Sequence, residues 1–222
     1  MKFVSKIVAH KLFAWSALIG LGVWLLVVPV LRDNLGANPL ENLLHRSGEI
    51  AIWTLGAILS LSPLRVLFPK SGLVAALNRH RRLIGVSACV YGVVHFALHL
   101  LYEGTWDAIV RSFSKPFIWF GASGLSTLIV LALTSNQLSM RLLRRNWKRL
   151  HRVAYLAAGL LMYHQAIAGK GHWRIGRWLV FSLVALQIAR VGKHAIMQRM
   201  RRPTRVRERA RPSIQPTLVP TQ

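Results

Sequence analysis

The stretch NWKRLHRVAYLAAGLLMYHQAIA, residues 146–168, decides what kind of protein this is. It opens with a basic cluster that contains His151, continues as a long apolar run, and meets His164 near its far end. An apolar run of about twenty residues is long enough to cross the hydrocarbon core of a bilayer as a helix. Because an ionisable side chain inside such a segment is costly, the two histidines are candidate functional groups.

A second apolar segment, residues 82–102, has the same kind of interruption at His95 and His99. A neutral imidazole nitrogen binds iron, and two imidazoles fill both axial positions of a haem. Two membrane-depth helices that each present histidines therefore predict a metal or a haem between them.

Composition separates two classes of basic protein. The chain has 222 residues, 53% of them hydrophobic, a mean hydropathy of +0.39 and a formal net charge of +24. Such a charge fits a nucleic-acid binder or a membrane protein with basic cytoplasmic loops. The basic clusters alternate with long apolar runs, which favours the lipid bilayer as the partner and excludes nucleic acid. The single cysteine, Cys89, lies in an apolar run and is predicted to pack there.

The predicted fold is an all-α membrane protein, a bundle of six transmembrane helices. The segments are residues 11–31, 47–61, 82–102, 117–133, 146–168 and 175–191. The first could be a signal peptide, but its apolar run is long for one and no clear cleavage site follows, so an uncleaved helix is expected. The second is short and is predicted to end at Ser62-Pro63.

Charge in the connections predicts the topology. One set of loops and termini carries 23 Lys and Arg residues and the other carries 7. Positive residues concentrate on the cytoplasmic side, so both termini are predicted to be cytoplasmic. Residues 1–192 would form the haem-binding transmembrane domain. Residues 193–222 would form a basic, disordered tail attracted to anionic lipid.

The spacing of the histidines predicts a common depth. His95 lies 13 residues beyond Arg82, and His164 lies 13 residues beyond His151. At 1.5 Å per residue, each ring would lie roughly 20 Å along its helix. Both rings are therefore expected in the outer half of the membrane.

Small residues share a helix face with these histidines. Gly85, Ala88, Gly92, His95 and His99 follow one another at spacings of 3, 4, 3 and 4. Such a stripe lets either a flat macrocycle or a neighbouring helix approach the backbone closely. Its ending in two histidines favours the macrocycle, with Gly85 and Gly92 packing against the haem face. His99 could be an alternative ligand, or could face the outer interface or a propionate.

Three other ionisable residues have open roles. His151 and His164 differ by about 140° around an ideal helix, so either the helix start is irregular or His151 serves a second haem, a flavin or a quinone head group. The alternative is an ordinary helix-end histidine among arginines. His80 lies at a similar depth and could be its partner. Glu49 is the only acid well inside an apolar segment, which suggests quinone or proton handling, unless it lies at the wet edge.

Several motifs together resemble the MsrQ (YedZ) family. They are RRLIG at 81–85 followed by His95, LALTSNQLSMRLLRRNWKRLHRVAYLAA at 131–158 followed by His164, ANPLENLLHRSGEIAIWTL at 37–55 and LSPLR at 61–65. The resemblance covers roughly residues 35–168, and the LHRVAYL block with His164 is its most specific part.

The resemblance implies a haem-binding membrane subunit of the ferric-reductase-like group in the bacterial inner membrane. Such a subunit takes electrons from the quinone pool and passes them to MsrP, a periplasmic molybdopterin enzyme that reduces oxidised methionines in envelope proteins. It implies haem b and FMN as cofactors, with haem histidines at His95, His151 and His164; His80 and His99 lie outside the family pattern. Substrate chemistry would occur in MsrP. The alternatives are a ferric or other metal reductase, a non-redox haem or metal transporter, and a structural subunit.

Overall fold

The protein is described by a computed structural model that covers residues 10–168, 180–193 and 195–198. Within these residues every regular element is a helix, and five helices are long and apolar enough to cross a membrane. They are Lys11–Leu31, Pro39–Leu67, Arg81–Glu103, Pro116–Leu133 and Val180–Gln198. The all-helical, multi-pass class is confirmed, whereas six spans and cytoplasmic termini stay predictions. Residues 175–179 of the sixth predicted segment and the tail from residue 199 lie outside the described residues.

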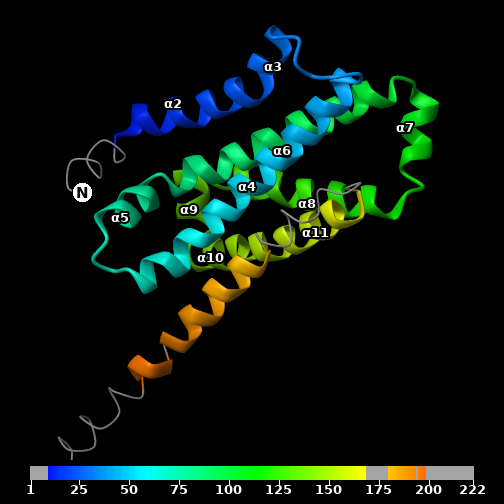
Figure 1. Ribbon diagram of the computed structural model, residues 1–222. Coiled ribbons are helices and arrows are strands. Elements are labelled where there is room, and N and C mark those ends of the chain that lie inside the picture. Colours follow the sequence, from blue (N-terminus) through cyan, green and yellow to red (C-terminus); the bar gives the residue numbers. More distant parts are fainter. Residues whose placement is uncertain (1–9, 169–179, 194, 199–222) are drawn as a thin grey trace, which may run out of the picture.

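The first span lies along one side of the bundle (Figure 1). It consists of α2 (Lys11–Gly22), a π-helical turn η1 (Val23–Val27) and α3 (Val28–Leu31). The wider turn comes just before Pro29, whose missing N–H interrupts the helical hydrogen-bond ladder. The Tyr91 hydroxyl of α6 donates to the carbonyl of Leu18 and connects this span to the bundle.

Helix α4 (Pro39–Leu67) is longer than predicted at both ends. Its start is fixed by Pro39 in the first turn and by reciprocal hydrogen bonds: Glu41 N–H donates to Asn38 Oδ1, and Asn38 Nδ2 donates to Glu41 Oε2. Its predicted end at Pro63 is wrong, because this fully buried proline packs inside the helix. The prediction that residues 32–46 form a polar connection is wrong from residue 39 onward.

The central helices follow the predicted segments closely. α5 (Gly72–Arg79) leads to α6 (Arg81–Glu103), which stops at Gly104, where φ is +72°. The short α7 (Trp106–Ser112) then crosses to α8 (Pro116–Leu133), where Pro116 occupies the first turn as expected. α4 packs mainly on α6, and α8 mainly on α11.

The fifth predicted segment is broken at its start. α9 (Gln137–Leu143) and α10 (Arg145–Leu150) precede a 3₁₀ turn η2 (His151–Val153), and only then does α11 (Ala154–Ala168) begin. The first 15 residues of α11 are described, as far as Ala168, where this described stretch of the chain ends.

The core lies where α4, α6, α8, α11 and the last helix meet. Ala88 of α6 and Ala157 of α11 are fully buried there, which lets the helices approach closely. Cys89 belongs to the same cluster, so its predicted packing role is confirmed. Large apolar side chains such as Trp24 and Val90 are exposed, as a lipid-facing surface requires.

Candidate functional site

The structure brings His95 of α6 and His164 of α11 together. Their ring centres are 6.2 Å apart and the ring planes are inclined by 77°. The two rings are neighbours, as a common depth requires, and their depth in the membrane stays a prediction. With metal–nitrogen bonds of about 2.0 Å, two imidazoles on opposite sides of one metal ion have ring centres roughly 6.3 Å apart. The observed separation matches that arrangement.

Hydrogen bonds to the backbone fix which ring nitrogen is free. His95 Nδ1 lies 2.9 Å from the carbonyl oxygen of Leu44, and His164 Nδ1 lies 2.8 Å from the carbonyl oxygen of Phe117. A carbonyl only accepts, so each Nδ1 carries the proton in these bonds. Each Nε2 therefore has a lone pair available for a metal, as is usual for histidine ligands.

Glycines on the neighbouring helices make room for both rings. A Cβ atom at Gly48 of α4 would lie 2.9 Å from the His95 ring, and one at Gly121 of α8 would lie 2.8 Å from the His164 ring. In each case, the carbonyl that accepts from the ring lies four residues before the glycine on the same helix. Each histidine thus rests on a bare strip of helix backbone.

The donor set fits a haem better than a bare ion. Among the described residues, no group of three or more His, Cys, Asp or Glu side chains could hold a metal. Zinc and similar ions take four ligands, most of them from protein in structural and catalytic sites. A haem supplies four nitrogens of its own, so His95 and His164 would be enough to hold it.

The other members of the predicted stripe have different neighbours. A Cβ at Gly85 would lie 3.3 Å from Ile58 of α4, and one at Gly92 would lie 2.9 Å from Leu125 of α8. These glycines admit side chains of neighbouring helices, and their predicted packing against a haem face stays a prediction. His99 Nε2 lies 3.3 Å from the Ser112 hydroxyl, so this histidine contacts α7.

His151 lies apart from the pair, in the 3₁₀ turn before α11. Its Nε2 is 3.2 Å from the Ser135 hydroxyl, its Nδ1 is 3.2 Å from the Trp147 carbonyl oxygen, and its ring stacks on the Trp147 indole at 3.9 Å. The irregular helix start that the 140° offset suggested is present, and any role in a second site stays a prediction.

His80 is a buried histidine whose role the sequence also left open. It connects α5 and α6 and is 9% exposed, and its Nε2 has no hydrogen-bond partner within the described part of the chain. A buried polar atom without a partner costs about 1–3 kcal/mol. A pairing of His80 with His151 stays a prediction.

The backbone strips under the two histidines were not predicted. Gly48, Gly121 and the carbonyls before them were missed because a carbonyl leaves no trace in a sequence. A usable signal does exist, because each glycine lies in the long apolar helix before the helix of its histidine. Gly48 is in α4 and His95 is in α6, and Gly121 is in α8 and His164 is in α11, with only short helices between them.

The chain is similar in sequence to known proteins. Residues 47–162 match the model of the family described as "Ferric reductase like transmembrane component". A relative from Xanthomonas oryzae pv. oryzae (strain MAFF 311018), the "Protein-methionine-sulfoxide reductase heme-binding subunit MsrQ", is 36% identical over 72% of this chain and 73% of its own length. The chain belongs to the MsrQ family.

Further MsrQ relatives show the same similarity. Proteins with the same descriptive name from Azospira oryzae (strain ATCC BAA-33 / DSM 13638 / PS) and Herminiimonas arsenicoxydans are 39% and 36% identical. The matches cover 60% and 63% of this chain, and 57% and 65% of the relatives. The ferric-reductase-like match contains His95 and His151 and ends two residues before His164.

Proposed function

We propose that this protein is a haem-binding electron-transfer subunit of the bacterial inner membrane. It would receive electrons from the quinone pool and pass them to a periplasmic MsrP-type molybdopterin reductase, which repairs oxidised methionines. The observation that carries the proposal is the pair His95 and His164, with ring centres 6.2 Å apart and both Nδ1 atoms bonded to carbonyls. Membership of the MsrQ family supports it, since the relatives are named as haem-binding subunits.

The chain's own residues would hold the haem and set its environment. His95 and His164 would supply the axial nitrogens, and the carbonyls of Leu44 and Phe117 would keep the rings oriented and increase their basicity. A bound haem of this kind would supply reversible one-electron transfer. FMN is proposed as a second cofactor on the family resemblance alone, and flavin fluorescence of an acid extract would test it.

A reduced-minus-oxidised absorption spectrum of the detergent-purified full chain tests the main proposal. We expect the signal of a low-spin b-type haem, and we expect decylubiquinol to reduce this haem when it is added to the oxidised protein. Absence of haem from protein made with ample haem supply would contradict the proposal, as would a haem that dithionite reduces and decylubiquinol does not.

The ferric-reductase-like match favours one alternative, in which the same scaffold reduces ferric iron or another metal directly. The two functions differ in the electron acceptor. Quinol-dependent reduction of a ferric chelate by the purified chain, without any partner protein, would favour the metal reductase. Reoxidation of the haem only when an MsrP-type reductase is added would favour the proposed conduit.

A further inference from the structure

A pocket with several ionisable side chains in its wall lies at the end of the bundle where α4 begins. It has a volume of about 510 Å³ and is lined by residues 35–38 and by Glu41, Asn42, His45, Arg46 and Glu49 of α4. Small-molecule sites have volumes of about 300–1,000 Å³. The pocket is therefore large enough for a single aromatic head group.

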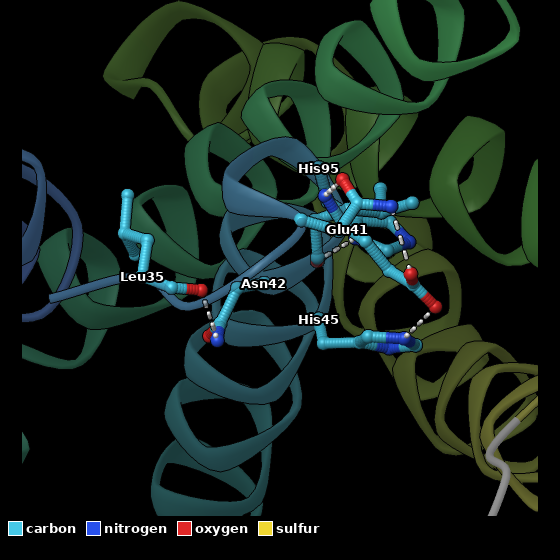
Figure 2. A network of polar contacts seen from close by, with 7 residues as sticks. Leu35, Glu41, Asn42, His45 and His95 are labelled. Atoms are coloured by element: carbon cyan, nitrogen blue, oxygen red, sulfur yellow. Dashed lines mark hydrogen bonds and ion pairs between the residues drawn. The ribbon is translucent and has the colours of Figure 1, made fainter.

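The ionisable side chains of the pocket form one row. Glu41, His45 and Glu49 are four residues apart, so they share a face of α4, and neighbouring members have Cβ atoms about 5–6 Å apart. His45 Nε2 lies 3.7 Å from the Glu41 carboxylate (Figure 2), and the Asn38 amide donates to the same carboxylate. In the part of the chain that the structure describes, Glu49 has no hydrogen bond or ion pair.

The walls of the pocket are held in place by their own contacts. Asn42 Nδ2 donates to the carbonyl of Leu35, which ties the loop to α4 (Figure 2), and Arg46 Nε donates to Asn42 Oδ1 at 2.8 Å. Leu35 itself is 6% exposed. The concave shape is therefore built into the fold.

The same turns of α4 serve both the pocket and the histidine pair. Leu44, whose carbonyl accepts from His95, directly precedes His45, and Gly48, which faces the His95 ring, directly precedes Glu49. A molecule in the pocket would consequently lie within two helix turns of the candidate haem site.

The position of Glu49 relative to the bilayer also points to a lipid-soluble ligand. With 29 residues, α4 is about 44 Å long, whereas the hydrocarbon core is about 30 Å thick. If the inner boundary lies near Arg65, Glu49 falls about one turn inside the outer boundary. A carboxylate at that depth is expected to serve a ligand or a proton path.

We propose that this pocket is the hydroquinone site, with Glu49 and His45 as acceptors for the two hydroxyl groups. This inference rests on the proposed function, because it assigns a location to the quinol that the function requires. Oxidation of one hydroquinone to the quinone releases two electrons and two protons. The electrons would leave one at a time toward the haem that His95 and His164 would hold. The protons go to the Glu49 carboxylate and the His45 imidazole, and then to the outer solvent.

Photolabelling with an azido-ubiquinone tests the location. The full chain, in vesicles of phosphatidylethanolamine and phosphatidylglycerol, is labelled in competition with decylubiquinone. We expect label in the peptide that contains residues 35–49. Labelling should fall about tenfold in Glu49→Gln, since a hydrogen bond to a charged group is lost. It should fall several-fold in His45→Gln, because His45 is the more exposed of the two residues. Glu103→Gln is the matched control, because Glu103 lies outside the pocket and should label like the parent chain.

The results distinguish failure of the pocket assignment from failure of the proposed function. Label in another segment, or equal labelling of Glu49→Gln and the parent, would overturn the pocket assignment. Glu49→Gln could also label like the parent and yet fail to transfer electrons to an MsrP-type protein. That result would overturn the pocket assignment and would indicate that the pocket surface binds the partner protein. Reduction of the parent haem by decylubiquinol is measured separately, and its absence would refute the proposed function while the label still reports on the pocket.

Discussion

Gly121 and His164 are in such close contact that a Cβ atom at position 121 would lie 2.8 Å from His164 Nδ1. The same relationship holds between Gly48 and His95, at 2.9 Å. The same glycine–histidine contact therefore occurs in two helix pairs, once between α4 and α6 and once between α8 and α11. Both rings are oriented by the protein itself, which is the preorganisation that a cofactor site needs.

Removal of either imidazole should abolish haem retention. In His95→Ala and in His164→Ala, one axial ligand is lost while the apolar helices are unchanged, so the chain should still insert. The haem-to-protein ratio of the purified protein measures the effect, and a membrane-extraction assay measures insertion. His10→Ala, an exposed position away from the pair, is the control. Normal haem content in either variant would refute the pairing.

A methyl group under the rings should loosen the site. Gly48→Ala and Gly121→Ala would each place a Cβ below 3.0 Å from an imidazole, and such overpacking typically costs about 1–3 kcal/mol. We expect haem content to fall several-fold and the haem midpoint potential to shift.

Gly159→Ala is the matched control for these two variants. A Cβ at position 159 meets nothing within 4 Å, and alanine favours a helix over glycine by about 1 kcal/mol. This variant should keep its haem. If Gly121→Ala and Gly159→Ala have equal haem content and potential, the close contact has no influence on the ligand.

Loss of His151 should leave the haem of the central pair in place. The His151 ring is engaged by Ser135 and Trp147 and lies in a separate turn. His151→Ala should therefore retain the low-spin spectrum assigned to His95 and His164. A fall in the haem-to-protein ratio without loss of that spectrum would reveal a second site at His151, whereas complete loss of the spectrum would contradict the assignment.

The hydrogen bond from Tyr91 should help to hold the first span on the bundle. The Tyr91 hydroxyl donates to the carbonyl of Leu18, and few other contacts join α2 to α6. Tyr91→Phe removes a bond worth about 1 kcal/mol, so residues 11–31 should exchange amide hydrogens faster, by a factor of about five. Tyr102→Phe is the control, because Tyr102 is 42% exposed. Equal exchange in both variants would show that other contacts hold this span.

The sequence predicted helices well where apolar length decided the outcome. The segments predicted at 11–31, 82–102 and 117–133 agree within one residue with Lys11–Leu31, Arg81–Glu103 and Pro116–Leu133. It predicted α4 poorly, because Pro63 and the polar residues 39–46 look like helix boundaries. Burial of Pro63 and the capping contacts of Asn38 with Glu41 override those local signals.

By itself, the sequence determined the membrane class and the family, and it predicted a common depth for His95 and His164. These follow from apolar length, motif spacing and helical rise, all of which are properties of one segment at a time. Only the tertiary structure decided which surfaces meet. It placed Gly48 and Gly121 under the rings, brought Ile58 to Gly85 and Leu125 to Gly92, engaged His151 with Ser135, and formed the pocket at Glu49. These features depend on contacts between helices distant in sequence, and in lipid such contacts are set by close backbone packing, which apolar composition alone does not specify.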